Sequence, residues 1–151
     1  MTGLVYTAID NEQDLMAAEN QIREFFPIHQ NFRPHFHTFD GYFEQMQRVM
    51  ADRARLLLVR DAAARPVGLA LYRMHHNTYQ HKLFFLEDLV VAENRRGGQI
   101  GAQILHYCED LARQHGCRHV SLDSGTFRTR AHKFYYVHGY VADCFHFSKA
   151  V

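Results

Sequence analysis

An apolar run followed by a glycine cluster and an amphipathic stretch is the feature that most constrains the fold of this chain. Residues 83–92, LFFLEDLVVA, carry only two charged side chains, Glu87 and Asp88, which is typical of a central strand covered on both faces. In residues 99–115 apolar side chains recur at spacings of three and four, which is the pattern of one helical face. The sequence therefore predicts a buried strand that turns directly into a long helix.

The turn between this strand and helix reads ENRRGGQIGA and contains Gly97, Gly98 and Gly101. Glycine permits a tight turn and a close approach of the backbone to a ligand, while free N–H groups and the dipole at a helix start favour an anion such as a pyrophosphate. The turn has neither the GKS or GKT of a P-loop nor the GxGxxG order of dinucleotide-binding folds, which argues against both classes. On spacing alone, a plain connection between two elements is an equal alternative to an anion site.

The rest of the chain divides into short elements bounded by capping and turn residues. With 151 residues and no repeat, low-complexity segment or linker, it fits one domain spanning residues 1–151. The expected order is β-α-α-β-β-β-α-β-α-β(β), an α/β fold with a mixed central sheet flanked by helices. Strands are predicted at 4–9, 55–60, 67–75, 119–123 and 140–149, helices from 10 or 11 to 25, from 38 or 40 to 53 and from 129 to 137, and an irregular loop at 26–37.

Composition argues against several classes of partner. Lys plus Arg number 17 against 16 acidic residues, and the basic side chains are dispersed, so neither nucleic acid nor an anionic membrane is indicated. The three cysteines lack CxxC spacing and the 12 histidines include no HExxH pair, so no metal site is predicted. The N-terminus has no signal-peptide pattern, and no apolar run approaches the roughly 18 residues of a membrane span. These observations predict a cytoplasmic protein without a metal or a membrane segment.

The turn and a second segment resemble the GNAT family of N-acetyltransferases. From Asp88 the chain reads DLVVAENRRGGQIGAQIL, against a family pattern of roughly DLxVxPxxRGxGIGxxLL, and residues 131–140, AHKFYYVHGY, are similar to its AxxFYxxxGF. Two motifs in the right order are much more specific than either alone. Within the family, the aminoalkylphosphonate N-acetyltransferases are similar in sharing an RxxAHxFY arrangement and an FxFxKxx ending, here Phe145 to Val151.

The resemblance implies an acetyl-CoA-dependent N-acetyltransferase, an acyltransferase with the GNAT fold. The backbone of three strand residues should pair with the pantetheine arm even if their side chains only pack in the core: Leu89, Val90 and Val91. The pyrophosphate should be held by the turn and the start of the helix: Arg96, Gly97, Gly98, Gln99, Ile100, Gly101 and Ala102. Two positions depart from the family pattern, because Gln99 replaces the penultimate glycine of the loop and Arg128 replaces an asparagine that contacts the pantetheine arm in many relatives. Phosphate binding should then rely more on backbone amides.

The resemblance also implies two catalytic roles. Tyr135 occupies the usual general-acid position, where a phenol with an ordinary pKa of about 10 can protonate the departing CoA thiolate; a purely structural hydroxyl is the alternative. Glu87 lies where several relatives place a base, and strand alternation should send it and Asp88 to opposite faces, leaving the other for a structural partner. An ion pair or helix cap is an equal alternative for Glu87. Tyr136 should point away from Tyr135 and pack or face solvent.

The mechanism that the resemblance implies is direct attack of a neutral amine on the thioester, with no acyl-enzyme. Cys108 lies on the apolar face of the predicted helix, so packing is expected of it rather than nucleophilic attack.

The acceptor is not identified by the sequence. A small primary amine, such as an aminoalkylphosphonate or a polyamine, is the first hypothesis, and protein N-termini or lysines are a second. A non-catalytic acyl-CoA-binding or regulatory module is a third, kept open by Gln99 and Arg128. A homodimer is left open too, since dimers are common in the family. Six side chains belong to the family's acceptor half and either border the pocket or simply pack: Phe32, Phe36, His37, His75, Tyr79 and His81.

Overall fold

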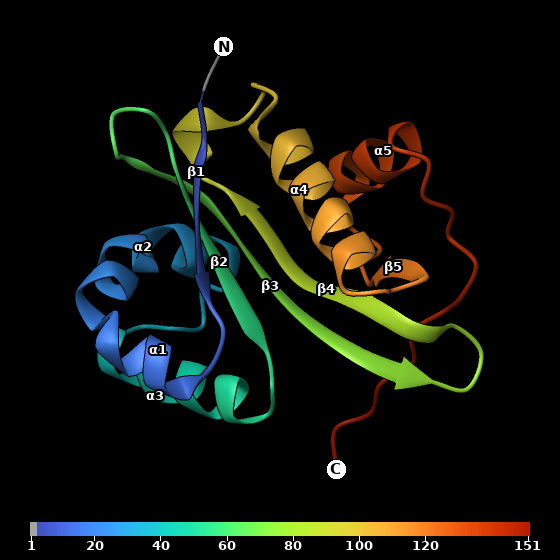
Figure 1. Ribbon diagram of the computed structural model, residues 1–151, viewed down its shortest axis with the longest axis horizontal. Coiled ribbons are helices and arrows are strands. Elements are labelled where there is room, and N and C mark those ends of the chain that lie inside the picture. Colours follow the sequence, from blue (N-terminus) through green and yellow to red (C-terminus); the bar gives the residue numbers. More distant parts are fainter. Residues whose placement is uncertain (1–2) are drawn as a thin grey trace. The chain divides into compact units, whose positions relative to one another are not determined.

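The computed structural model describes residues 3–151. The chain divides into two compact units, and the boundary along the sequence falls between Ser121 and Leu122. Its helices and strands, drawn in Figure 1, are β1 (Val5–Ile9), α1 (Glu12–Ala17), α2 (Glu19–Phe32), α3 (Phe39–Ala51), β2 (Arg55–Arg60), β3 (Pro66–Asn77), β4 (His81–Val91), the short 3-10 helix η1 (Glu93–Arg95), α4 (Ile100–Gln114), β5 (His119–Leu122) and α5 (Thr129–Val137).

The five strands form one sheet in the order β1-β2-β3-β4-β5. The first four are antiparallel to their neighbours, and α4 carries the chain from β4 to β5. In the first unit α1, α2 and α3 lie on one face of the sheet and α4 on the other (Figure 1). The predicted α/β fold, with a central sheet between helices, is confirmed.

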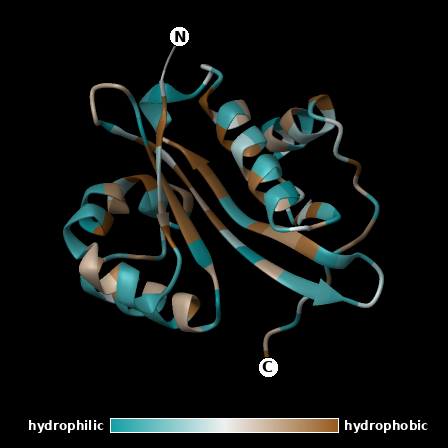
Figure 2. Ribbon diagram, viewed as in Figure 1, coloured by the Kyte–Doolittle hydropathy of each residue, from teal (hydrophilic) through white to brown (hydrophobic). Residues whose placement is uncertain are grey.

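The main core lies between the sheet and helices α1 to α3. Figure 2 shows hydrophobic and hydrophilic residues alternating along the helices, as expected of helices with one apolar face. The buried face of α3 consists of Tyr42, Phe43, Met46 and Met50. On the other side of the sheet α4 buries the face that the spacing predicted: Ile100, Ile104, Leu105, Cys108 and Ala112.

Two predicted capping residues begin helices. Asn11 accepts a hydrogen bond from the Asp14 N–H at 2.8 Å, and Thr38 accepts one from the Gly41 N–H at 3.1 Å. Each side chain satisfies a helical N–H that has no partner within the helix.

Helix α2 continues through Pro27 to Phe32, where the sequence predicted an irregular loop from residue 26. Proline lacks an N–H and its ring crowds the preceding turn, which is why a break was expected. The helix persists because it buries one face in the core: Ile22, Phe25 and His29. Burial of this face outweighs the local cost of the proline, about 3 kcal/mol.

Residues 140–149 form no strand, contrary to the prediction. Their large apolar side chains are exposed instead, with Phe145 at 87% and Phe147 at 90%. A strand needs a neighbouring backbone for its N–H and C=O groups, and residues 140–149 pair with none of the five strands of the sheet. The final strand of the expected order is therefore absent from the described residues.

Gly68 on β3 lies at a close approach between α4 and the sheet. A Cβ added there would meet the carbonyl oxygen of Val90 at 2.7 Å and Cδ1 of Ile104 at 2.8 Å. We therefore expect Gly68→Ala to lower the free energy of unfolding by about 1 to 3 kcal/mol, because the added methyl overpacks against backbone. Urea denaturation measures this change. Gly3→Ala is the control, since nothing lies within 4 Å of a Cβ at that position, and equal losses in the two variants would contradict the argument.

Candidate functional site

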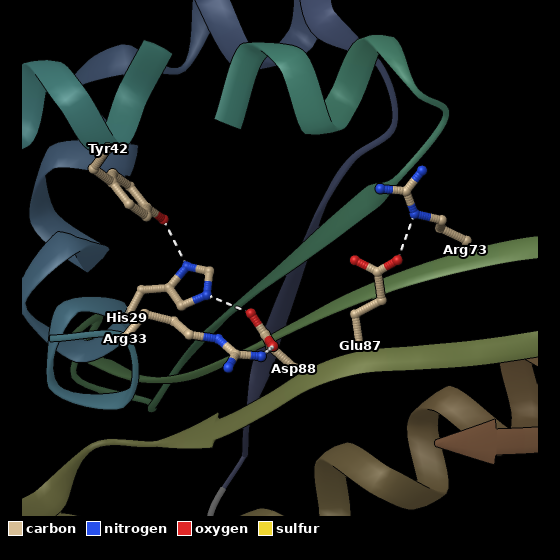
Figure 3. Close-up of polar contacts among 6 residues, drawn as sticks. All are labelled: His29, Arg33, Tyr42, Arg73, Glu87 and Asp88. Carbon is tan, nitrogen blue, oxygen red and sulfur yellow. Dashed lines mark hydrogen bonds and ion pairs between the residues drawn. The ribbon is translucent and has the colours of Figure 1, made fainter. Parts of the chain in front are cut away.

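A bulge in β4 places two carboxylates on the same side of the sheet. The register with β3 shifts so that Leu71 lies opposite Asp88 and Tyr72 opposite Leu86, which leaves Glu87 as an extra residue. Both acidic side chains therefore leave β4 toward the helices of the α1 to α3 side, as Figure 3 shows. The expectation that strand alternation would send them to opposite faces is wrong, because alternation is interrupted at a bulge.

Asp88 is buried and belongs to a polar network that joins β4 to α2 and α3 (Figure 3). Its Oδ2 accepts a hydrogen bond from His29 Nε2 at 2.7 Å, and its Oδ1 accepts one from an Arg33 guanidinium nitrogen at 2.5 Å. His29 Nδ1 lies 2.8 Å from the Tyr42 hydroxyl. In the neutral imidazole, Nε2–H donates to the carboxylate and Nδ1 accepts from the tyrosine. Asp88 is therefore the carboxylate that connects β4 to α2 and α3.

The protonation of this network follows from its surroundings. Burial acts to raise the pKa of Asp88, but the hydrogen bonds and charges of His29 and Arg33 outweigh it, so the pKa lies below its ordinary value. Burial, and then the charge of Asp88, raise the pKa of Tyr42. The network thus holds an ionised carboxylate and a protonated phenol.

Glu87 makes an ion pair with Arg73 of β3, in which Arg73 Nε donates to Oε1 at 2.5 Å. Arg73 also donates from Nη1 to the carbonyl oxygen of Asp52, the C-cap residue of α3, at 2.6 Å. The ion-pair alternative for Glu87 is thus observed. The Glu87 side chain is 27% exposed, whereas that of Asp88 is 6% exposed. Of the two carboxylates, Glu87 is therefore the one that solvent reaches.

The end of β4 has one edge without a neighbouring strand. On the β3 side, Leu89 to Val91 pair with Ala70 to Gly68. On the other side of β4 lies β5, which has only four residues, whereas β4 has eleven. The Arg118 N–H, just before β5, donates a hydrogen bond to the Lys82 carbonyl near the start of β4. From that point β5 is too short to reach Leu89, whichever way it runs. Among the described residues, the outer edge of Leu89 to Val91 therefore has no partner strand.

The glycine turn after β4 has the local geometry that an anion site needs. Gly97 has φ +83°, a conformation that favours glycine, while Arg96 to Gln99 are exposed and Ile100 is buried. Gln99, at the N-cap of α4, makes no side-chain cap hydrogen bond, and the first turn of α4 contains no acidic residue. The helix thus begins with N–H groups that its N-cap side chain leaves uncapped, next to an exposed turn.

The remaining predicted site residues lie in the second unit, on or beside α5, whose bounds are those predicted from the sequence. Arg128 is the N-cap residue, and its guanidinium lies 5.1 Å from the ring centroid of Phe127. Tyr135 makes edge-to-face contacts with the rings of Phe134, at 5.3 Å, and Tyr140, at 5.8 Å. Tyr136 is 59% exposed, as expected of a surface position.

The six side chains predicted for the acceptor half have no common environment. Phe32 and Phe36 pack partly against the main core, His37 is exposed, and Tyr79 is 73% exposed at the turn between β3 and β4. His75 belongs to β3, and His81 begins β4. A cleft of about 840 Å³ lies between α2 and residues 92–94, and none of these six side chains lines it.

His29, Arg33, Tyr42 and Arg73 were not identified from the sequence. His29 follows Ile22 and Phe25 on the helical face, a spacing that would have revealed it had α2 been extended past Pro27. Arg73 pairs with Phe85 in the strand register, and its side chain reaches Glu87 across the β3–β4 pair. The sequence carries no signal for this register.

Residues 3–151 contain neither a cluster of potential metal ligands nor a helix suited to crossing a membrane. No group of three or more His, Cys, Asp or Glu side chains in this part of the chain is arranged to hold a metal ion. None of the helices described there is both long enough and apolar enough to cross a membrane.

Comparison with known proteins identifies the family. The family model described as "Acetyltransferase (GNAT) family" matches residues 17–140, which include both the β4–α4 turn and α5. The chain belongs to the GNAT acetyltransferase family. The resemblance drawn from two short motifs is thereby confirmed.

Two curated relatives carry acetyltransferase names. The aminoalkylphosphonate N-acetyltransferase of Salmonella typhimurium strain LT2 is 34% identical over 83 residues, which cover 55% of this chain and 54% of that enzyme. The match thus spans about half the length of that enzyme. The uncharacterised N-acetyltransferase YhdJ of Bacillus subtilis strain 168 is 28% identical over 122 residues, covering 80% of this chain and 84% of that protein.

Solved structures share the fold at low sequence identity. The aminoglycoside N-acetyltransferase AAC(6')-Iy in complex with CoA superposes with a TM-score of 0.76 and 15% identity, covering 99% of this chain and 96% of that one. A ribosomal-protein-alanine N-acetyltransferase from Brucella melitensis biovar Abortus 2308 also gives a TM-score of 0.76, with 16% identity and coverage of 99% and 100%. At these identities the comparison establishes the fold.

Proposed function

We propose that this protein is an acetyl-CoA-dependent N-acetyltransferase that acetylates the amine of a small molecule. The observation that carries the proposal is the exposed glycine turn at the uncapped start of α4, directly after the unpaired edge of β4. The family match covers both features and continues through α5, which supports one acetyltransferase domain over residues 1–151. Three free cysteines suit a reducing compartment, so we place the enzyme in the cytoplasm.

The donor would bind along β4 and the start of α4. The backbone edge of Leu89 to Val91 suits the amide groups of a pantetheine arm, which can pair with it as an added strand would. The N–H groups of Arg96 to Ala102 suit the pyrophosphate, because they lie at the positive end of the α4 dipole. We assign Arg128 to the same cofactor by its place in the family pattern.

The chemistry would be direct attack of the amine on the thioester. Cys108 is unsuited to form an acyl-enzyme, because burial, and then the charge of Glu109, raise the pKa of its thiol to about 12. Glu87 is proposed as the base that takes the amine proton, through water or directly, since of the two β4 carboxylates it is the one that solvent reaches. Arg73 would hold that carboxylate in place. Tyr135 is proposed as the acid that protonates the departing thiolate.

The acceptor class rests on the relatives. The Salmonella relative is named for aminoalkylphosphonates and one fold neighbour for aminoglycosides, both small amines. We therefore favour a small primary amine, with aminoalkylphosphonates as the first candidates.

Thiol release from acetyl-CoA, measured with a panel of amines, tests the proposal. The panel should include aminoalkylphosphonates, polyamines, aminoglycosides and peptides with free N-termini. Turnover with a small amine is expected. A protein that binds CoA but releases no thiol with any amine would be a binding module, and one that neither binds nor consumes acetyl-CoA would refute the assignment.

Replacing Glu87 by glutamine should lower kcat roughly 100-fold, because general base catalysis typically contributes factors of 10² to 10⁴. The loss should shrink at high pH, where more of the amine is already neutral. A pH profile of kcat/KM for variant and wild type measures this. Loss of stability without a change in that profile would instead leave Glu87 as the structural partner of Arg73.

A further inference from the structure

A second buried carboxylate, Asp61, lies at the turn between β2 and β3. Its Oδ1 accepts hydrogen bonds from the N–H groups of Ala63 and Arg65, both at 3.0 Å. Its Oδ2 accepts one from Arg65 Nε at 2.9 Å and one from Arg95 Nη1 at 2.8 Å. One oxygen thus organises the turn itself, while the other receives a side chain from a segment that lies 34 residues further along the chain.

Arg95 is the last residue of η1 and directly precedes the glycine turn. No residue of η1 is buried, so apolar packing contributes little to its position. The Arg95 side chain is only 26% exposed and points back to the carboxylate of Asp61. The hydrogen bond from Arg95 is the largest influence that lowers the pKa of Asp61, followed by that from the Arg65 backbone. The pair therefore stays ionised at neutral pH.

The glycine turn is anchored at its two ends by different means. At the end toward α4, Ile100 is buried in the core. At the end toward β4, the Arg95–Asp61 ion pair connects the chain to the β2–β3 turn. The four residues between, Arg96 to Gln99, are exposed, and Gly97 and Gly98 give the backbone wide conformational freedom. Without the Arg95–Asp61 anchor, a ligand would have to order these residues itself, which weakens binding.

We propose that Asp61 is a positioning residue for the cofactor: acting through Arg95, it holds the Arg96–Gly101 turn in the shape that receives the pyrophosphate of CoA. This inference rests on the proposed function, in which that turn binds acetyl-CoA. It assigns a binding role to a residue outside both family motifs. Arg95 serves as the connecting side chain and points away from the turn, toward Asp61.

Two variants separate positioning from other roles. Asp61→Asn keeps an amide oxygen that can accept from the Ala63 and Arg65 N–H groups. The oxygen that accepts from Arg95 is replaced by an NH₂ group, which cannot accept a hydrogen bond from the guanidinium. Arg95→Gln removes the guanidinium. Each should raise the Kd for free CoA roughly tenfold, and the double variant should do no worse than either single variant, because the two act as one unit. KM for acetyl-CoA should rise in parallel, with kcat and KM for the amine unchanged.

Arg65→Gln is the matched control, since Arg65 shares the carboxylate but lies within the β2–β3 turn. We measure CoA binding by calorimetry and the melting temperature of each variant. Failure of the wild type to bind CoA would overturn the proposed function and this inference with it. If the wild type binds CoA, Arg95→Gln binds it more weakly, and Asp61→Asn binds it as well as or better than the wild type, then Arg95 contacts the phosphate directly. That result would overturn the positioning role of Asp61 and leave the proposed function intact. An equal loss in Arg65→Gln would reduce Asp61 to a turn-forming residue.

Discussion

Replacing His29 by leucine is expected to lower the free energy of unfolding by about 2 to 4 kcal/mol, since it removes a hydrogen-bond partner from a buried carboxylate and from a buried hydroxyl. His29 is 2% exposed, and it connects Asp88 to the hydroxyl of Tyr42, which is itself 1% exposed. The substitution leaves both groups short of a hydrogen-bond partner in a place that water does not reach. Arg33 continues to pair with Asp88, so the carboxylate remains charged while its stabilisation falls.

Urea denaturation measures this loss, and the chain provides a matched control. His35 is exposed, so His35→Leu makes the same chemical change and should alter stability by less than about 0.5 kcal/mol. The triple variant His29→Leu, Tyr42→Phe, Asp88→Leu should recover much of the loss, because an apolar replacement of the whole network leaves no buried charge. If His29→Leu is as stable as His35→Leu, the network contributes little to the free energy of unfolding.

The effect should depend on pH in a defined direction. The folded pKa of Asp88 lies below its ordinary value of 3.8, so its ionised form contributes stability above that pH. This contribution is lost as pH falls through the folded pKa. The difference in stability between wild type and His29→Leu should therefore be largest near neutral pH and narrow on acidification below about pH 4. A constant difference over that range would argue against an ionised Asp88.

Replacing Tyr135 by phenylalanine is expected to lower kcat by about 100-fold or more, as removal of a general acid typically does. The variant keeps the ring, so its contacts with the rings of Phe134 and Tyr140 should persist. Binding of CoA should change little, because the phenol is proposed to act only at the sulfur of CoA, while the contacts proposed for its pantetheine arm and pyrophosphate lie on β4 and the glycine turn. The expected loss is therefore confined to the chemical step.

Tyr136→Phe is the control for this prediction, since that side chain is 59% exposed on the same helix. Single-turnover thiol release with the best amine of the panel compares the two variants directly. Equal rates in both, at unchanged CoA affinity, would remove the general-acid role and leave protonation of the thiolate to solvent.

The sequence was informative wherever a local pattern decides the outcome. The apolar spacing of residues 99–115 predicted the buried face of α4, and residue type narrowed each of two helix caps to a pair of candidates that included the observed cap, Asn11 or Thr38. The glycine cluster predicted a tight turn before a helix, and Gly97 adopts the backbone conformation for which glycine is suited. Hydrogen-bonding and conformational preferences of this kind act over a few residues, so they are visible in the sequence.

Predictions failed where distant segments outweigh local preference. Pro27 indicated a break, yet burial of the α2 face keeps the helix intact. Alternation indicated opposite faces for Glu87 and Asp88, yet the pairing with β3 introduces a bulge that places them together. Residues 140–149 have the pattern of a strand, yet they pair with no strand of the sheet and form none.

The sequence alone determined the family resemblance, the α/β class and the turn that we propose as the donor site, because each depends on residues close together in the chain. Only the tertiary structure decided how the carboxylates are used. His29 and Asp88 are 59 residues apart, and Asp61 and Arg95 are 34 apart, so neither pair has a local signature. Strand register and helix packing bring them together, and the low polarity of the buried surroundings then makes each pairing strong enough to fix the elements that carry the site.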